Sequence, residues 1–145
     1  MADIAKDRTW YGFDSFKGLP EDWHAQAKKG AFACDIPTDL PKNVELVIGL
    51  FQDTLIPFMH RHQQPFSFIH FDADLYSSTI YVMRAIEPWL HPKGTHMMFD
   101  QITMNDFSIA HEGRAMQEWL DETGLRCEII GRQKRDGAIF KVWKA

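Results

Sequence analysis

The pattern of apolar and polar residues along the chain predicts strands that alternate with helices. The sharpest strand is a nearly continuous apolar run, Phe66 to Phe71, and such a run is typical of a strand in a parallel sheet covered by helices on both faces. A second apolar run, Thr95 to Phe99, stops at Asp100. Between the two runs, apolar residues recur at helical spacing: Val82, Met83, Ile86, Trp89 and Leu90. This pattern predicts a βαβ unit.

The part of the chain before this unit reads as a further pair of strands and a helix. We expect a short aromatic strand from Thr9 to Phe13 that ends at Asp14, and a second strand over Val44 to Ile48. The residues between them have turn chemistry and weak periodicity, which predicts an irregular excursion. A short helix is expected over Thr54 to His62, with Pro57 in its first turn.

The remaining elements follow from caps, breakers and a hairpin signal. Ser77-Ser78-Thr79 is expected to cap the helix after the Phe66 strand, and Pro88 to kink or restart it. A second helical stripe ends at Gly124 and contains Ala115, Met116, Trp119 and Leu120. Leu125 to Ile130 and Ala138 to Trp143 are predicted to pair antiparallel through a turn containing Asp136-Gly137. The chain is thus predicted to be a single α/β domain over residues 1–145.

Composition narrows the classes of protein and partner. The chain is 45% hydrophobic and 25% charged, as in globular proteins, and no apolar run approaches the roughly 18 residues of a membrane helix. Its net charge of −4 argues against a nucleic-acid partner. The two cysteines, Cys34 and Cys127, have neither metal-site nor disulfide spacing, which favours a cytoplasmic protein.

Candidate chemistry lies where the predicted strands end. Asp14, Asp72 and Asp100 each follow a strand, and the carboxyl ends of parallel strands line the ligand crevice of an open α/β sheet. Asp74 and Gln101 add further oxygen donors, and several such donors suit Mg²⁺. The competing interpretation is that the aspartates only cap helices.

Several longer strings resemble one enzyme family. These are Tyr11-Gly-Phe-Asp-Ser-Phe-Lys-Gly-Leu-Pro-Glu, Asn43-Val-Glu-Leu-Val-Ile-Gly with Phe51 and Asp53-Thr-Leu, His70-Phe-Asp-Ala-Asp-Leu-Tyr-Ser-Ser-Thr, Phe99-Asp, and His111-Glu112 before Ala115 and Gln117-Glu118. In order and spacing they resemble macrocin O-methyltransferase-type enzymes, which are class I S-adenosylmethionine (SAM)-dependent methyltransferases. The resemblance implies a Rossmann-like, mostly parallel sheet with a terminal antiparallel hairpin.

The resemblance also implies a cofactor site. Asp14 would accept hydrogen bonds from the ribose hydroxyls of SAM, with Ser15 beside it. Gly49, Phe51 and Asp53 would lie beside the adenine, although Phe51 has core packing and Asp14 an Asx-turn cap as alternatives.

A metal and a base are implied as well. Asp72 and Asp100 would hold Mg²⁺ that binds a hydroxyl of a small-molecule substrate, of sugar or natural-product type. The family more often has an acid where this chain has Gln101, which can still ligate through its carbonyl oxygen. His111 is the candidate base, with a surface or capping role as the alternative, whereas His70 and His96 are expected to be packing residues inside strands.

One part of the family pattern is missing from this sequence. The first strand and its Gly-rich loop, which approach the methionine end of SAM, do not precede Trp10. We therefore expect an incomplete domain, with Met1 as an internal or misassigned start, or a homodimer or rearranged sheet that covers the unpaired strand. A catalytically inactive fragment or binding module is one alternative function. An aspartyl-phosphate phosphohydrolase, suggested by Asp72-Ala73-Asp74, is the remote one.

Overall fold

The structure is a computed structural model that describes residues 6–102, 109–132 and 137–144. Backbone contacts divide the chain into two compact units, Met1–Thr54 and Leu55–Ala145. The expected single domain over residues 1–145 stays a prediction. None of the helices in the described part of the chain has the length and apolar character that crossing a bilayer requires.

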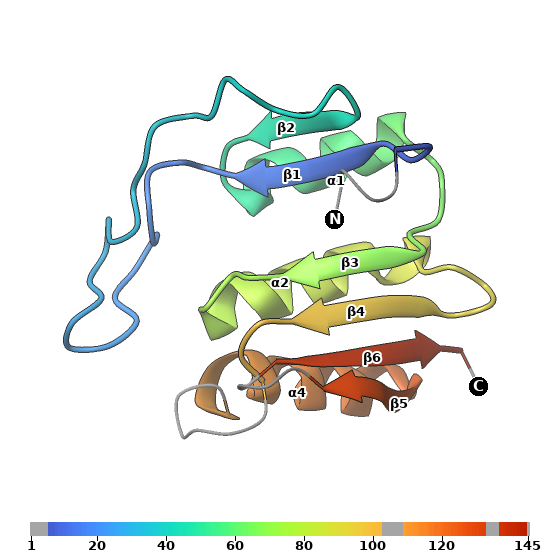
Figure 1. The fold of residues 1–145 in the computed structure, drawn as a ribbon. Helices are drawn as coiled ribbons and strands as arrows, with labels where there is room; N and C mark the ends of the chain where they lie inside the picture. Colours follow the sequence, from blue (N-terminus) through green and yellow to red (C-terminus); the bar gives the residue numbers. More distant parts are fainter. Residues whose placement is uncertain (1–5, 103–108, 133–136, 145) are drawn as a thin grey trace. The chain divides into compact units, whose positions relative to one another are not determined.

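The first unit contains a two-stranded parallel sheet (Figure 1). Its strands are β1 (Trp10–Asp14) and β2 (Val44–Ile48), which pair in register from Trp10 with Val44 to Asp14 with Ile48. Both strands confirm the sequence prediction. The segment between them contains no helix or strand, as expected, apart from an isolated bridge between His24 and Ala27.

Helix α1 (Phe51–Arg61) corrects the prediction of a helix from Thr54 to His62. It starts three residues earlier because the amides of Asp53 and Thr54 both donate to the carbonyl of Leu50, at 3.0 and 3.1 Å. Pro57 therefore lies inside the helix and not in its first turn, and the helix tolerates the missing N–H at that position.

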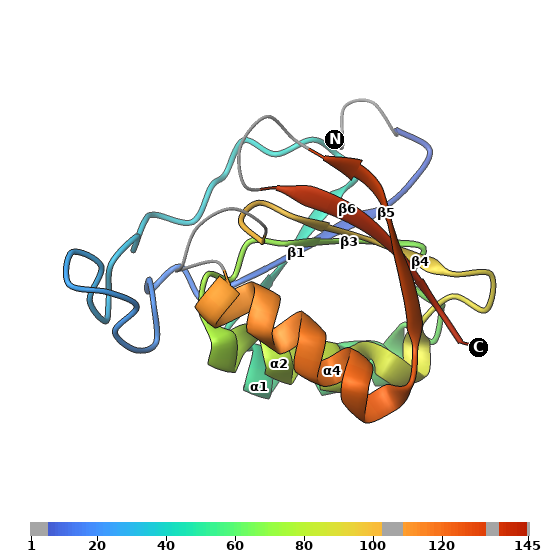
Figure 2. The same ribbon diagram turned by 90° about the horizontal axis from the view of Figure 1, so that it is seen from below.

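The second unit is a four-stranded sheet with helices on one face (Figures 1 and 2). The strand order is β3-β4-β6-β5. The strands are β3 (Phe68–Phe71), β4 (Thr95–Phe99), β5 (Arg126–Arg132) and β6 (Ala138–Trp143). The β3–β4 pair is parallel, and β6 is antiparallel to both β4 and β5. The predicted parallel pair and terminal antiparallel hairpin are confirmed, although Asp136 of the predicted turn lies outside the described residues.

Burial on β3 differs from the prediction that helices cover both of its faces. Phe71 is buried, whereas His70 is exposed and Phe68 and Ile69 are half-buried. The core lies on the face where Phe71 stacks on Phe99 with ring centroids 4.7 Å apart. Apolar side chains of the two helices described below complete it, among them the buried Met83, Ile86 and Trp119.

The helices of this unit are α2 (Tyr76–Ile86) and α4 (Arg114–Thr123). A 3₁₀ turn, Glu87–Trp89, follows α2 and confirms the restart predicted at Pro88. A single π-helical turn, η2 (Ile109–Gly113), precedes α4, and Gly124 ends α4 in the left-handed conformation with φ +67°.

The amino-terminal cap of α2 is not the one predicted. The residue before the helix is Leu75, which offers no capping side chain, and the serines and threonine expected to cap it lie inside the helix. Ser78 and Thr79 are buried there. The amide of Tyr76 is satisfied instead by His111, a residue distant in sequence.

Candidate functional site

Two predicted metal ligands end neighbouring strands of the second unit. Phe71 pairs with Phe99 in the β3–β4 register, so Asp72 and Asp100 directly follow paired residues. The amide of Asp100 donates to the carbonyl of Phe71 over 3.4 Å, and Gln101 follows Asp100. Across residues 6–102, 109–132 and 137–144, no three or more His, Cys, Asp or Glu side chains are grouped as a metal site. The magnesium site therefore stays a prediction.

His70 contacts one of these acids. Its Nε2 lies 2.8 Å from Oδ1 of Asp100, and the two side chains are 32% and 42% exposed. The packing role predicted for His70 is wrong, because its position on β3 turns the ring to the strand-end carboxylate instead of the core. His96, in contrast, is half-buried on β4.

A tight turn follows Asp72. The amide of Leu75 donates to the carbonyl of Ala73 over 2.5 Å, and Asp74 between them has φ +58°. A three-residue turn with a central residue of positive φ is the rare and strained form of the γ-turn. The Asp72–Leu75 turn therefore needs contacts from elsewhere in the fold to hold it.

Two consecutive residues of the π-helical turn supply such contacts. Oε1 of Glu112 accepts a hydrogen bond from the amide of Ala73 over 3.3 Å. Nδ1 of His111 accepts one from the amide of Tyr76, also over 3.3 Å. Because these amides lie on either side of Asp74, the turn is held at both ends. A neutral imidazole that accepts at Nδ1 carries its proton on Nε2.

Glu112 is an unusual acid in this setting. It is only 2% exposed. Burial raises its pKa to about 8, against the opposing effect of the Ala73 hydrogen bond, and the charges of Asp74, Asp72 and Asp100 raise it further. At neutral pH Glu112 is therefore mostly protonated.

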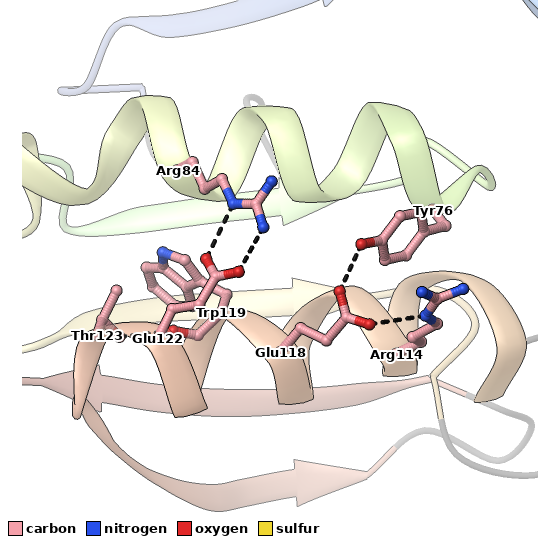
Figure 3. Close-up of polar contacts among 7 residues, drawn as sticks. All are labelled: Tyr76, Arg84, Arg114, Glu118, Trp119, Glu122 and Thr123. Atoms are coloured by element: carbon pink, nitrogen blue, oxygen red, sulfur yellow. Dashed lines mark hydrogen bonds and ion pairs between the residues drawn. The ribbon is translucent and has the colours of Figure 1, made fainter.

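Polar contacts fix α4 against α2 beside this turn (Figure 3). Tyr76 donates its hydroxyl hydrogen bond to Glu118, which also accepts one from Nε of Arg114 over 2.8 Å. The Arg114 guanidinium lies 4.3 Å from the centre of the Tyr76 ring, a cation–π contact. One turn or so further along, Nε of Arg84 donates to Glu122 over 2.9 Å. The amino terminus of α4, and with it the π-helical turn, is thereby held at the amino terminus of α2.

The predicted ribose acid lies in the first unit, at the end of β1. Oδ1 of Asp14 accepts a hydrogen bond from the amide of Phe16 over 2.8 Å, which is the Asx turn named as the alternative role. The hydroxyl of Ser15 similarly accepts from the amide of Lys17 over 3.1 Å. These two local bonds shape the loop and leave Oδ2 of Asp14 as a second acceptor atom.

The predicted adenine residues lie next to Asp14 in the same unit. The amide of Gly49 donates to the carbonyl of Asp14 over 3.0 Å, so the ends of β1 and β2 are tied together. Gly49 has φ +144°, and an added Cβ would lie 2.7 Å from Cγ2 of Thr54, so this position requires glycine. Phe51 is half-buried and Asp53 exposed, both in the first turn of α1.

Asp72 and Asp100 follow strand ends as predicted, whereas the contacts of their neighbours His70 and Glu112 were not predicted. His70 carried a signal, since it belongs to the same string as Asp72 and precedes it by two residues. Glu112 belongs to the His111-Glu112 motif, but nothing in the sequence alone indicates that its carboxyl group contacts Ala73.

Comparison with solved structures identifies proteins of similar fold. One is CalS11, described as a calicheamicin methyltransferase, with a TM-score of 0.69 and 25% sequence identity over 92% of this chain and 60% of the other. Another is the O-methyltransferase NovP, with a TM-score of 0.69 and 21% identity over 99% of this chain and 63% of the other. An apo structure of CalS11, described as a TDP-rhamnose 3'-O-methyltransferase, has a TM-score of 0.52 and 27% identity over 70% of this chain and 43% of the other.

These structures confirm the resemblance to methyltransferases and the Rossmann-like fold class predicted from the motifs. The chain therefore spans 60% and 63% of the length of the first two of these solved structures and 43% of the third. No protein-family model matches the chain, and no curated protein is a significant match to it.

Proposed function

We propose that this chain, which shares the fold of solved O-methyltransferases, serves methyl transfer from SAM to a hydroxyl group of a small molecule of sugar or natural-product type. The observation that supports the proposal most is the pair of carboxylates, Asp72 and Asp100, that follow paired residues of adjacent parallel strands. In this fold class the carboxyl ends of the strands face the ligand crevice.

The acids at the carboxyl-end edge of β3 and β4 suit a divalent cation. Three acids at the edge help to keep the buried Glu112 protonated, so added positive charge there would be favourable. We propose that Asp72, Asp100 and the amide oxygen of Gln101 hold Mg²⁺, which prefers oxygen ligands and keeps several waters. When bound, Mg²⁺ would lower the pKa of an acceptor hydroxyl and orient it.

Protein groups would orient the cofactor. We propose that Asp14 accepts from the ribose hydroxyls through Oδ2, because Oδ1 is engaged with Phe16. Ser15 would shape the same loop, and Gly49, Phe51 and Asp53 would border the adenine, with the Phe51 ring available for stacking.

The acceptor hydroxyl must lose a proton during transfer, and we propose His111 for this step. Its Nδ1 accepts the Tyr76 amide, so action as a base at Nε2 requires a tautomer change that gives up this hydrogen bond. The Tyr76 amide therefore holds the His111 ring in place. Nε2 of His111 can accept a proton only after a local rearrangement.

We also propose that the protein is a cytoplasmic homodimer. β3 is an edge strand of the four-stranded sheet, and edge strands readily accept another strand. Light scattering after size exclusion tests this, with an expected mass twice that of the 16.9 kDa chain. A mass equal to one chain would contradict it.

SAM binding is the decisive test of the function. We expect isothermal titration calorimetry to detect SAM binding to the chain, and Asp14→Asn to weaken it by about tenfold or more, because a hydrogen bond to a charged group is worth about 1.5–3 kcal/mol. The exposed Asp39→Asn is the matched control and should bind as the unmodified chain does. A chain that folds but binds no SAM would refute activity for it.

A further inference from the structure

We infer that the π-helical turn Ile109–Gly113 is a clamp for the Asp72–Leu75 turn, and that Glu112 is a positioning residue which orients the strand-end acids through the backbone of Ala73. This inference deepens the proposed function and rests on it for the role of Asp72.

The Asp72–Leu75 turn is strained, and contacts from the π-helical turn support it. Asp74 has φ +58°, a conformation that costs free energy in a residue with a side chain, and one short-range hydrogen bond from Leu75 to Ala73 closes the turn. Strained backbone persists where surrounding structure determines it. Glu112 and His111 bond the amides of Ala73 and Tyr76, which lie immediately before and two residues after Asp74.

The clamp is fixed in place by contacts between α4 and α2. The π-helical turn runs directly into α4, and α4 is tied to α2 by the Tyr76–Glu118 and Arg84–Glu122 contacts (Figure 3). Tyr76 belongs to both sets, since its amide meets His111 and its hydroxyl meets Glu118. The extra residue of a π-helical turn shifts the side chains before α4 out of the normal helical register, and such turns are frequent at functional sites.

Glu112 is poorly placed to react with a substrate directly. Its side chain is 2% exposed and its Oε1 is directed at a backbone amide, so a substrate has little access to it. A neutral carboxyl group and an amide side chain can each accept that hydrogen bond through a carbonyl oxygen. Glu112 therefore acts through the Ala73 backbone, and glutamine should replace it.

Amide hydrogen exchange measured by NMR on the full chain tests the clamp without a substrate. Glu112→Ala should make the Ala73 amide exchange about tenfold faster, which corresponds to the loss of one hydrogen bond, and should leave the β4 amide of Met97 unchanged. Glu112→Gln should restore slow exchange at Ala73. Asp121→Ala is the matched control, because Asp121 is exposed on α4 and accepts a hydrogen bond from Gln117 of the same helix, and it should not affect Ala73.

A functional measurement separates the clamp from the proposed function. Where methyl transfer is detected, Glu112→Ala should lower kcat by about tenfold, as loss of an outer partner of a site does, and Glu112→Gln should recover most of it. Unchanged Ala73 exchange in Glu112→Ala, or a glutamine variant that behaves like the alanine variant, would overturn the clamp. Altered exchange without detectable SAM binding would leave the clamp standing and refute the proposed function.

Discussion

Nε2 of His70 lies 2.8 Å from Oδ1 of Asp100, so a histidine on one strand fixes an acid that follows the next strand. If Asp100 binds a metal as proposed, this hydrogen bond would hold its carboxylate in one orientation. His70 thus links β3 to the acid that follows β4.

We predict that His70→Ala weakens Mg²⁺ binding about tenfold or more, because Asp100 loses the group that orients it. Calorimetric titration of Mg²⁺, or the Mg²⁺ dependence of methyl transfer, measures this. His96→Ala is the matched control, since His96 lies on the neighbouring strand and is half-buried. Equal metal affinity in His70→Ala and the unmodified chain would argue against Asp100 as a ligand.

We predict that Glu112 makes the folded state less stable as pH rises. Burial, together with the charges of Asp74, Asp72 and Asp100, raises the pKa of Glu112 from an ordinary 4.5 to about 8. Between these two values the folded chain holds a proton that the unfolded chain has lost, so the free energy of unfolding falls with pH by up to about 1.4 kcal/mol per unit. Below pH 4.5 the stabilisation of the folded state by the protonated Glu112 is fully present.

Glu112→Gln isolates this effect. The variant keeps the acceptor for Ala73 and cannot ionise, so its stability relative to the unmodified chain should increase steadily from about pH 4.5 to about pH 8. Urea unfolding in a chelating buffer at several pH values measures the difference. A difference that stays constant across this range would show that Glu112 ionises normally in the folded chain.

Much of the fold was predictable because the governing interactions are local. The apolar run of β4, the stop at Gly124 and the strand of Trp10–Asp14 follow from side-chain pattern and backbone preference. The cap of α2 was not predictable, because the amide of Tyr76 donates to His111, which lies in a turn 35 residues later. The nearby cluster Ser77-Ser78-Thr79 predicted a side-chain cap for this helix, and that prediction was wrong.

The candidate site was also predictable only in part. Strand ends could be located from the sequence, and with them Asp14, Asp72 and Asp100. The surroundings that set charge and orientation come from long-range packing, as with Glu112 near Ala73 and His70 near Asp100. A pattern of residue types contains no direct signal for such distances.

We predict that Gly18→Ala is far more destabilising than Gly30→Ala. Both glycines have positive φ, +75° and +84°, so both substitutions carry a similar backbone cost of about 1 kcal/mol. A Cβ at Gly18 would lie 2.3 Å from the carbonyl oxygen of Ala31, whereas a Cβ at Gly30 would meet nothing within 4 Å. Gly18 therefore lets the loop after Asp14 pack against the Gly30–Ala31 backbone.

Gly18→Ala and Gly30→Ala carry a similar backbone cost. The difference between them therefore measures only the close contact of residue 18 with the Gly30–Ala31 backbone. We expect proteolysis between β1 and β2 to be faster in Gly18→Ala than in Gly30→Ala, together with weaker SAM binding, because the loop that begins at Asp14 is displaced. Equal protease resistance in the two variants would contradict the packing explanation.

Substitutions of His111 separate its two roles. Asparagine places an amide oxygen close to the position of Nδ1, so His111→Asn should still accept the Tyr76 amide and unfold like the unmodified chain, whereas His111→Ala should lose about 1 kcal/mol. If His111 also removes the acceptor proton, His111→Asn lowers kcat by about 10² or more with little change in the KM for SAM, because asparagine is not a base. Activity retained in His111→Asn and lost in His111→Ala would show that the histidine acts only as part of the clamp, and the base would then have to be sought among the strand-end carboxylates.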